Sequence, residues 1–418
     1  MESISTAPDG GLVVAGISSS FSAGGDGDAL VVKLNPDGSV AWAKTYGGAG
    51  EDMALDIKAA PDGGYIMAGW TESFGAGQSD CWLLKLDADG NVQWSKAFGG
   101  PGMEQAVYAD PLPSGGYVVA GATTSFGAGD GDYWVLKIDS AGGVVWQKAY
   151  GGPLGDAPPN EYGEQVARAV VGADGNIVVA SVSFSFGKGD GDVWVLKLDA
   201  ADGSPVWQYA YGDAGEDSNW MLSRATGGGY LFSGSFVDVA TQDPDVWVVK
   251  LAEDGTVEWQ KTYGIAGVFD EALYHIPTSD GGVLVQAYVE QTSGDDWRSL
   301  LLKLDSSGTL AWSRVYRNGP VSWPNAAVEV SDGFYVVGVG IADVSVYDQQ
   351  MWVFKIDSGG AITQNCQLGT AYEPVDRVPT AIATPTTATV TDTSSLATVT
   401  DTAVDAVPVT LAPRYDCH

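Results

Sequence analysis

The sequence predicts an all-β fold, a seven-bladed β-propeller with four-stranded antiparallel blades and a Thr-rich C-terminal tail. A motif recurs seven times along the chain, and each copy contains four short strand-like segments separated by turn residues. Gly provides many of these turns, because 57 of the 418 residues are Gly, against a usual share of ~7%.

The repeat is easiest to follow through a Lys at the end of its third strand. The steps from one copy to the next are 52, 52, 60, 53, 53 and 52 residues. Seven copies predict a propeller over residues 1–368, in which blades close radially and leave few exposed edges. The seven Lys are Lys33, Lys85, Lys137, Lys197, Lys250, Lys303 and Lys355.

The second copy illustrates the four strands of a blade, named A to D in chain order. We expect them at residues 54–60, 65–71, 81–87 and 92–98. Their residues are β-branched, aromatic or alternating, and Gly, Asp and Pro bound them. No window of the sequence shows a helical period of useful length.

Tryptophan marks strands C and D. Large rings at a fixed register bury much area, so we expect these to pack between neighbouring blades. Strand C carries Trp82, Trp134, Trp194, Trp247 and Trp352, with Leu30 and Leu300 in the other two copies. Strand D carries Trp42, Trp94, Trp146, Trp207, Trp259 and Trp312.

Two parts of the repeat resemble known families. Asp62–Gly69 with Trp82–Trp94 resembles the β-propeller repeat (SBBP type) of large secreted proteins of bacteria and archaea. The spacing from Asp87 through Gly90 to Trp94 is similar to the tryptophan-docking motif of quinoprotein propellers. The first resemblance implies secretion, and the second implies that strand A is innermost and strand D outermost. Such repeats occur in proteins of many roles, so function must be argued from sites.

Composition narrows the function classes. The net charge of −33 argues against nucleic acid as a partner, because phosphate backbones are bound by Lys and Arg. No apolar stretch approaches the ~20 residues of a transmembrane helix. No signal peptide is visible at the start of the sequence. We nevertheless expect a secreted or cell-surface protein.

The end of the chain departs from the repeat. Gln364 and Leu368 stand where the seventh copy should have Trp and Tyr. From residue 369 to 418 the composition shifts to Thr, Ala, Val and Pro. Alternating Thr and Val favours extra strands, whereas Thr/Pro-rich low complexity favours an extended stalk, and an assembly element is a further alternative.

Two of the three Cys lie at the ends of this divergent segment. We predict a disulfide between Cys366 and Cys417 that closes the tail against the seventh blade. Closing a loop of about 50 residues contributes roughly 4 kcal/mol in the chain-entropy model.

Catalytic residues are scarce. With only His275 and His418, the chain has little material for His-based metal sites or Ser-His-Asp catalysis. Carboxylates are abundant, but they recur blade by blade as turn residues do. We therefore expect a protein that is not an enzyme, and a glycan-active enzyme using loop carboxylates is the alternative.

The Asp-Gly-Asp loops before strand C are the candidate metal site. Ca²⁺ prefers carboxylate and carbonyl oxygens, but Asx-turns that cap strand C explain the motif without a metal. No other cofactor is expected. The candidate ligands are Asp26, Asp28, Asp130, Asp132, Asp190 and Asp192.

Aromatic residues outside the repeat pattern are the candidate binding site. The B–C loops and the D–A connections should lie on one face of the ring, because strands alternate in direction. The 60-residue step places an insertion, Gly151–Glu164, on this face. The candidates are Tyr162, Trp220, Trp70, Trp297 and Trp323. They predict a binding surface, with Tyr162 and Trp220 across adjacent blades, or else they fill space between uneven loops.

The leading functional hypothesis is a secreted, non-catalytic propeller that binds a partner with this face. The partner would be an extracellular protein, a polysaccharide or another copy of the chain. The alternatives are a structural subunit of an extracellular filament or surface layer, and a carbohydrate-active enzyme.

Overall fold

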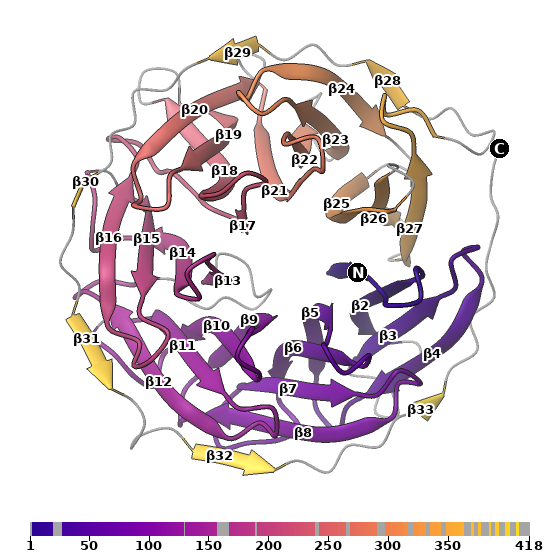
Figure 1. Ribbon diagram of the computed structural model, residues 1–418, viewed down its shortest axis with the longest axis vertical. Coiled ribbons are helices and arrows are strands. Elements are labelled where there is room, and N and C mark those ends of the chain that lie inside the picture. The colour runs from indigo at the N-terminus through magenta and orange to yellow at the C-terminus, as the bar shows by residue number, and fades with distance from the viewer. Residues whose placement is uncertain are drawn as a thin grey trace.

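The computed structural model is a ring of antiparallel sheets with the N-terminus near its centre (Figure 1). It describes residues 2–19, 27–128, 130–156, 167–188, 190–238, 242–264, 268–290, 297–316, 321–331, 335–343 and 348–362. It also describes six short tail strands within residues 369–408.

Blades 1 to 3 are each built from four consecutive strands. Blade 1 contains β1 (Ser3–Thr6), β2 (Leu12–Ser18), β3 (Asp28–Leu34) and β4 (Val40–Tyr46). Blade 2 contains β5 (Asp52–Ala59), β6 (Tyr65–Thr71), β7 (Asp80–Leu86) and β8 (Val92–Gly99). Blade 3 contains β9 (Glu104–Pro111), β10 (Tyr117–Thr123), β11 (Asp132–Ile138) and β12 (Val144–Gly151).

Blades 4 to 6 follow the same order. Blade 4 contains β13 (Arg168–Val171), β14 (Ile177–Ser183), β15 (Asp192–Leu198) and β16 (Pro205–Tyr211). Blade 5 contains β17 (Met221–Arg224), β18 (Tyr230–Asp238), β19 (Asp243–Leu251) and β20 (Val257–Gly264). Blade 6 contains β21 (Asp270–Pro277), β22 (Val283–Glu290), β23 (Trp297–Leu304) and β24 (Leu310–Tyr316).

The prediction of seven four-stranded blades is wrong, because the propeller has six complete blades. The remaining sheet has only three strands among the described residues: β25 (Val321–Glu329), β26 (Tyr335–Asp343) and β27 (Asp348–Ile356). This sheet lies between blade 6 and blade 1 and fills the gap in the ring (Figure 1). The sequence loses its repeat where a fourth strand would follow, at Gln364, which lies outside the described residues.

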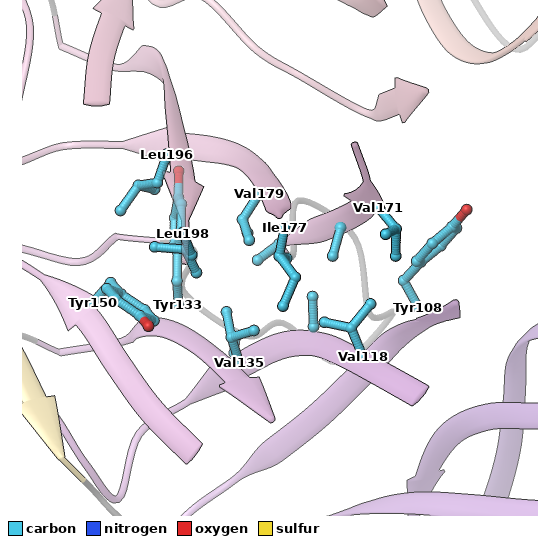
Figure 2. Packing of buried hydrophobic residues seen from close by; sticks show 14 of the residues in the cluster. Tyr108, Val118, Tyr133, Val135, Tyr150, Val171, Ile177, Val179, Leu196 and Leu198 are labelled. Atoms are coloured by element: carbon cyan, nitrogen blue, oxygen red, sulfur yellow. The ribbon is translucent and has the colours of Figure 1, made fainter. Parts of the chain in front are cut away.

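Apolar side chains fill the space between adjacent blades. The strand C rings Trp82, Trp134, Trp194 and Trp247 are fully buried. Figure 2 shows the packing of blade 3 against blade 4, where Tyr133 and Val135 face Val179 and Leu196. This arrangement follows from the alternation of each strand, which directs one apolar set toward each neighbouring blade.

The strand D tryptophans dock onto the next blade. In six successive junctions the indole Nε1 donates to a carbonyl oxygen in the C–D turn of the following blade, at 2.7–3.2 Å. The pairs are Trp42–Ala88, Trp94–Ser140, Trp146–Ala200, Trp207–Glu253, Trp259–Ser306 and Trp312–Ser358. The strand order of the sheets confirms the expected progression from strand A inside to strand D, but strand D is not outermost, because a tail strand pairs with its outer edge in each of the six complete blades (Figure 1).

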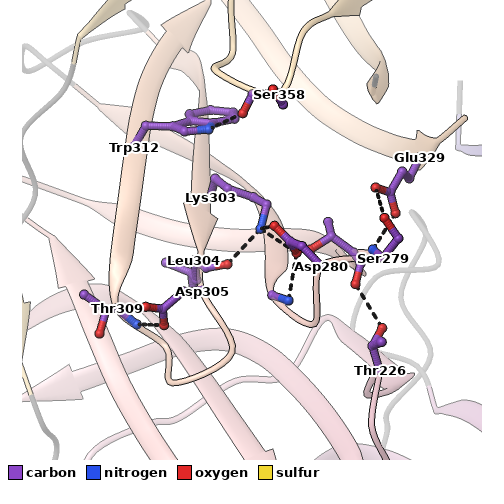
Figure 3. A network of polar contacts seen from close by, with 12 residues as sticks. Thr226, Ser279, Asp280, Lys303, Leu304, Asp305, Thr309, Trp312, Glu329 and Ser358 are labelled. Carbon is purple, nitrogen blue, oxygen red and sulfur yellow. Dashed lines mark hydrogen bonds and ion pairs between the residues drawn. The ribbon is translucent and has the colours of Figure 1, made fainter. Parts of the chain in front are cut away.

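The repeating Lys joins strands within a blade. Lys303 forms an ion pair of 2.9 Å with Asp280 in the A–B turn and donates to the Leu304 carbonyl (Figure 3). Lys33, Lys85 and Lys197 form equivalent ion pairs with Asp9, Asp62 and Asp174. These buried ammonium groups are thus structural.

Six tail strands run around the outside of the ring, and we call them the C-terminal belt (Figure 1). Each pairs antiparallel with the outer strand of one blade, and the order is reversed, from blade 6 back to blade 1. The belt comprises β28 (Gly369–Ala371), β29 (Val375–Arg377), β30 (Thr384–Pro385), β31 (Thr389–Asp392), β32 (Thr398–Asp401) and β33 (Val407–Pro408). Every complete blade therefore has a fifth, outermost strand.

Candidate binding site on the loop face

The B–C loops and D–A connections meet on one face of the ring, which we call the loop face. The backbone N–H of Asp52 donates to the Gly27 carbonyl, and the N–H of Glu72 donates to Glu51, so loops of blades 1 and 2 contact each other. The same contacts recur at later junctions, as between Glu104 and Ser79. The expected convergence of these loops is observed in the described residues.

Five junctions on this face hold two acidic residues each, the acid pairs. One member lies at strand C of a blade, and the other precedes or begins strand A of the next. All ten side chains are buried, with 0–6% of their surface exposed. The acid pairs are Asp28/Asp52, Asp80/Glu104, Asp132/Asp156, Asp192/Asp217 and Asp245/Asp270.

The two carboxylates of a pair approach one glycine. A methyl group on Gly99 would lie 2.0 Å from Asp80 Oδ1 and 2.8 Å from Glu104 Oε2, so only Gly fits there. Backbone donors hold both acids: Ala76 and Gly77 donate to Asp80, and Gly100 donates to Glu104. Each acid thus caps the loop that carries it, and the two carboxylates meet beside the glycine.

Burial and repulsion by neighbouring carboxylates raise the pKa of two of these acids. Burial, together with the charges of Asp213 and Asp192, raises the pKa of Asp217 to about 7. Burial likewise raises the pKa of Asp80, with a smaller contribution from the charge of Glu104.

The predicted metal ligands fall into two environments. Asp28, Asp132 and Asp192 are the buried members of acid pairs, whereas Asp130 and Asp190 are exposed and Asp26 lies outside the described residues. The N–H groups of Ala128 and Lys188 donate to Asp132 and Asp192 at 2.7 and 2.9 Å. The described residues contain no group of three or more His, Cys, Asp or Glu that could hold a metal. The geometry favours loop capping, and Ca²⁺ binding stays a prediction.

The candidate aromatic residues also lie in different environments. Trp70 has 4% of its surface exposed and packs in the apolar cluster between blades 2 and 3, so no ligand can reach it. Trp220 is half-buried at the start of blade 5. Tyr162 lies outside the described residues, and so do the side chains of Trp297 and Trp323, at the start of β23 and in β25. The expected pairing of Tyr162 with Trp220 therefore remains a prediction.

Trp220 belongs to a polar cluster that spans blades 5 and 6. Its Nε1 donates to Glu271 Oε1 at 2.5 Å, and Ser218 Oγ donates to the same oxygen at 2.9 Å. The Tyr288 hydroxyl donates to Glu271 Oε2 at 2.5 Å. Tyr288 also stacks on Phe269, with ring centroids 5.5 Å apart and planes 3° apart. A carboxylate thus orients three half-buried rings at one junction, and we call these residues the Glu271 cluster.

This cluster breaks the repeat. In the strand registers, Glu271 occupies the position of Met53 in blade 2 and Gln105 in blade 3. Sequence reasoning did not single out Glu271 among the abundant carboxylates. Aligning the seven copies position by position reveals it, because an ionisable residue replaces Met or Gln.

His275 lies below this cluster and is fully buried. Its ring nitrogens contact Ser223 Oγ at 2.7 Å and Ser233 Oγ at 2.6 Å. Burial lowers the pKa of His275 to about 3, and the charge of Arg168 contributes to this shift. A neutral, enclosed imidazole cannot act as a general base on a ligand at the surface.

The cysteines divide between the core and the tail. Cys81 is a free, buried thiol in β7, and burial raises its pKa. Cys366 and Cys417 both lie outside the described residues, so the predicted disulfide remains a prediction. Among the described residues, no helix has the length and apolar character needed to span a bilayer.

Comparisons with known proteins agree with the fold. A family model described as "Domain of unknown function (DUF5122) beta-propeller" matches residues 7–40. None of the curated proteins matches the sequence.

Two solved structures are similar to this chain. One is a puromycin hydrolase mutant complexed with PGG, at 13% identity and a TM-score of 0.51; the match covers 89% of this chain and 54% of the hydrolase. Another is Sqt1 from Chaetomium thermophilum, at 12% identity and a TM-score of 0.47, covering 90% of this chain and 87% of Sqt1. The chain thus spans about half of the hydrolase, and at 13% identity its likeness to the hydrolase concerns the fold alone. The family match and the ring of repeated blades identify the chain as a β-propeller repeat protein.

Proposed function

We propose that this protein is a non-catalytic binding protein that holds an extracellular protein or polysaccharide on its loop face, at blades 5 and 6. The observation that supports this function is the Glu271 cluster. It is a departure from the repeat at which half-buried rings are fixed by a carboxylate. Rigid aromatic side chains with a polar edge are the usual anchors of binding surfaces.

The burial of the other ionisable groups argues against an enzyme. The acid pairs are enclosed and hydrogen-bonded to backbone N–H groups, so a sugar cannot approach them as a glycosidase requires. His275 is neutral and enclosed between two Ser hydroxyls. Secretion or display at the cell surface is part of the proposal and rests on the resemblance of the repeat to secreted propellers.

Binding by Trp220 and Glu271 variants tests the proposal. The purified protein is screened against glycans and extracellular proteins, and the best ligand is titrated against each variant. Trp220→Ala should weaken binding at least tenfold, since loss of a central aromatic anchor costs about 2 kcal/mol or more. Glu271→Gln should weaken it less, because the amide keeps the shape and accepts hydrogen bonds.

Trp42→Ala is the matched control. Trp42 is also half-buried and also donates one hydrogen bond, but it lies at the C–D turns on the opposite face. The Trp42→Ala variant should leave the affinity for the ligand unchanged. Equal losses of affinity in Trp42→Ala and Trp220→Ala would show a general effect of stability and contradict the proposal. Turnover of a glycan, or filaments in electron micrographs, would favour one of the alternatives instead.

A further inference from the structure

The first strand of each complete blade carries one residue at the same level of the ring. Strand A lies at the inner edge of its sheet, around the axis of the ring (Figure 1). The level is set by a row of paired residues that ends in strand D, two residues after the docking Trp, as Asp56–Ala68–Leu83–Lys96 does in blade 2. The strand A members of this row, which we call the axial tier, are Ser3, Asp56, Tyr108, Arg168, Met221 and Tyr274.

The axial tier differs from blade to blade, although its surroundings are regular. In blades 1 to 4 the residue opposite it in strand B is always Ala. In the tier itself blade 2 supplies a carboxylate at Asp56, blade 4 a guanidinium at Arg168 and blade 6 a phenol at Tyr274. Because these three residues come from alternate blades, they approach the axis from three sides. Unlike polar residues at an otherwise regular level indicate a role beyond packing.

Asp56 is held in place by the blades on both sides of it. Its Oδ1 accepts a hydrogen bond from Ser3 Oγ at 3.0 Å, and its Oδ2 accepts one from the Ala109 backbone N–H at 3.3 Å. The side chain is buried, so its orientation is fixed. Each carboxylate oxygen has two lone pairs, and therefore each can accept a further hydrogen bond.

Arg168 and Tyr274 lack such partners. Within the described part of the chain, neither the Arg168 guanidinium nor the Tyr274 hydroxyl forms a hydrogen bond or an ion pair. Both residues are half-buried, so each remains partly accessible to solvent. A guanidinium has five N–H donors, and leaving them without partners in a partly desolvated place is costly. These two groups are therefore free to bind a molecule at the axis.

The three groups act on one another across the axis without direct contact. Burial lowers the pKa of Arg168, whereas Tyr274 and Asp56 oppose this shift. Burial and the charge of Asp56 raise the pKa of Tyr274 to about 12, and Arg168 opposes that shift. The guanidinium, the phenol and the carboxylate thus surround one place at the axis.

We propose that the axial tier binds a small zwitterion, a free amino acid, with its carboxylate on Arg168 and Tyr274 and its ammonium on Asp56. The planar fork of a guanidinium matches the two oxygens of a carboxylate, and the phenol is a further donor. The open lone pairs of Asp56 suit an ammonium. A simple anion fits less well, because Glu2 joins Asp56 as a second carboxylate acting on the single guanidinium. The site shares no residue with the Glu271 cluster and goes beyond the proposed function.

Calorimetric titration of the full chain with the free amino acids tests this site. At least one of them should bind and raise Tm. Its amide, which lacks the carboxylate charge, and its N-acetyl derivative, which lacks the ammonium, should each bind roughly tenfold more weakly or worse. Acetate and phosphate are the simple-anion probes, and both should bind more weakly than the amino acid.

Variants assign each end of the ligand. Arg168→Gln should weaken binding of the amino acid roughly tenfold or more but leave the affinity for its amide unchanged. Asp56→Asn keeps an oxygen for Ser3; it should weaken binding of the amino acid and leave the affinity for the N-acetyl derivative unchanged. Arg224→Gln is the control, since Arg224 also lies on an inner strand, at the end of β17, but is exposed. It should leave all three affinities unchanged.

Arg168→Lys keeps the test decisive if Arg168→Gln does not fold. It retains the positive charge but not the planar fork, so it should fold and still bind the amino acid more weakly than the wild type. Absence of binding by every free amino acid at about 10 mM would overturn the proposal. Acetate or phosphate binding as tightly as the best amino acid, or an unchanged affinity in both Arg168 variants, would overturn it as well.

Discussion

Neighbouring sheets of the ring pack against each other in two different ways. Six junctions are docked by a strand D Trp, and the closing junction is the one at which the three-stranded sheet meets blade 1. Gly90 lies in the C–D turn of blade 2, under the Trp42 ring. A methyl group added to Gly90 would lie within 3 Å of that ring. At Gly38, the same point in blade 1, no atom of the described residues lies within 4 Å of such a methyl group. The closing junction therefore lacks the indole that the other junctions use.

Strand C shows the same contrast. The buried Trp82 of blade 2 faces blade 1, but Leu30 of blade 1 is half-buried and faces the three-stranded sheet. Among the residues whose side chains the structure describes, the buried apolar cluster at the closing junction contains Ile4, Val14, Val32, Ala43 and Ala326. Among the described residues, the closing junction thus has a half-buried Leu where the neighbouring junction has a buried Trp.

Replacing one strand C residue at each kind of junction should give the largest difference. Trp194→Ala removes a fully buried indole that packs on Tyr133 at 4.8 Å and should lower the free energy of unfolding by about 3–5 kcal/mol. Leu30→Ala should cost about 1–2 kcal/mol, because Leu30 is only half-buried. Urea unfolding of both variants checks this, and equal losses would show that the closing junction is as well packed as the others.

Asp217 should make the junction between blades 4 and 5 sensitive to pH. The folded-state pKa of Asp217, about 7, exceeds its unfolded value, so folding favours the protonated form. Its contribution is therefore present below about pH 4 and is lost as pH rises toward 7. At ~1.4 kcal/mol per unit the loss reaches about 4 kcal/mol. Asp217→Asn should match the wild type at pH 4 and exceed its stability by about 2–4 kcal/mol at pH 8, as thermal unfolding would show.

Asp9 is the control for the direction in which stability changes with pH. It lies in blade 1, beside the closing junction. The Lys33 ammonium lowers the pKa of Asp9, so its ion pair stabilises the fold at neutral pH and is lost on acidification below about pH 4. Asp9→Asn should therefore lose stability near pH 7 and not at pH 3. A stability gain in Asp9→Asn at high pH, or none in Asp217→Asn, would contradict the assignment of these shifts.

A Tyr in strand D makes a smaller contribution to the stability of a junction, and one junction lacks this Tyr. The Tyr211 hydroxyl donates to the Gly255 carbonyl at 2.6 Å, and Tyr46 and Tyr150 make the same bond. Blade 2 has Phe98 at this position, so its hydroxyl bond is missing. Tyr211→Phe should cost about 1 kcal/mol, and Phe98→Tyr should gain about half as much, both measured from urea midpoints. No gain in Phe98→Tyr would mean that the C–D turn of blade 3 is displaced.

Much of this architecture is predictable from the repeat, because the strands of seven or eight residues and the docking Trp form a recurring pattern in the sequence. The expected strand 65–71 is β6 without change, and 92–98 differs from β8 by one residue. The belt is not predictable in this way, since strands such as Thr384–Pro385 gain their identity only from the blade they pair with. The same holds for the Glu271 cluster, because Trp220 and Tyr288 are 68 residues apart and meet only when blades 5 and 6 pack.

The smallest expected effect comes from restoring the missing indole at the closing junction. Gln364→Trp would place an indole two residues before Cys366, where the other strand D copies have their docking Trp. The open C–D turn of blade 1, with Asn35 and Gly38 at its ends, offers the carbonyl and the space that Ala88 and Gly90 offer to Trp42. We expect a gain of about 0.5–1 kcal/mol in the free energy of unfolding, because a docking indole such as Trp42 is only half-buried and adds one hydrogen bond. Gln364→Leu is the control, since it adds apolar area without the donor. If both variants gain equally, apolar contact and not docking geometry limits the closing junction, and if neither gains, the belt already supplies what the indole would.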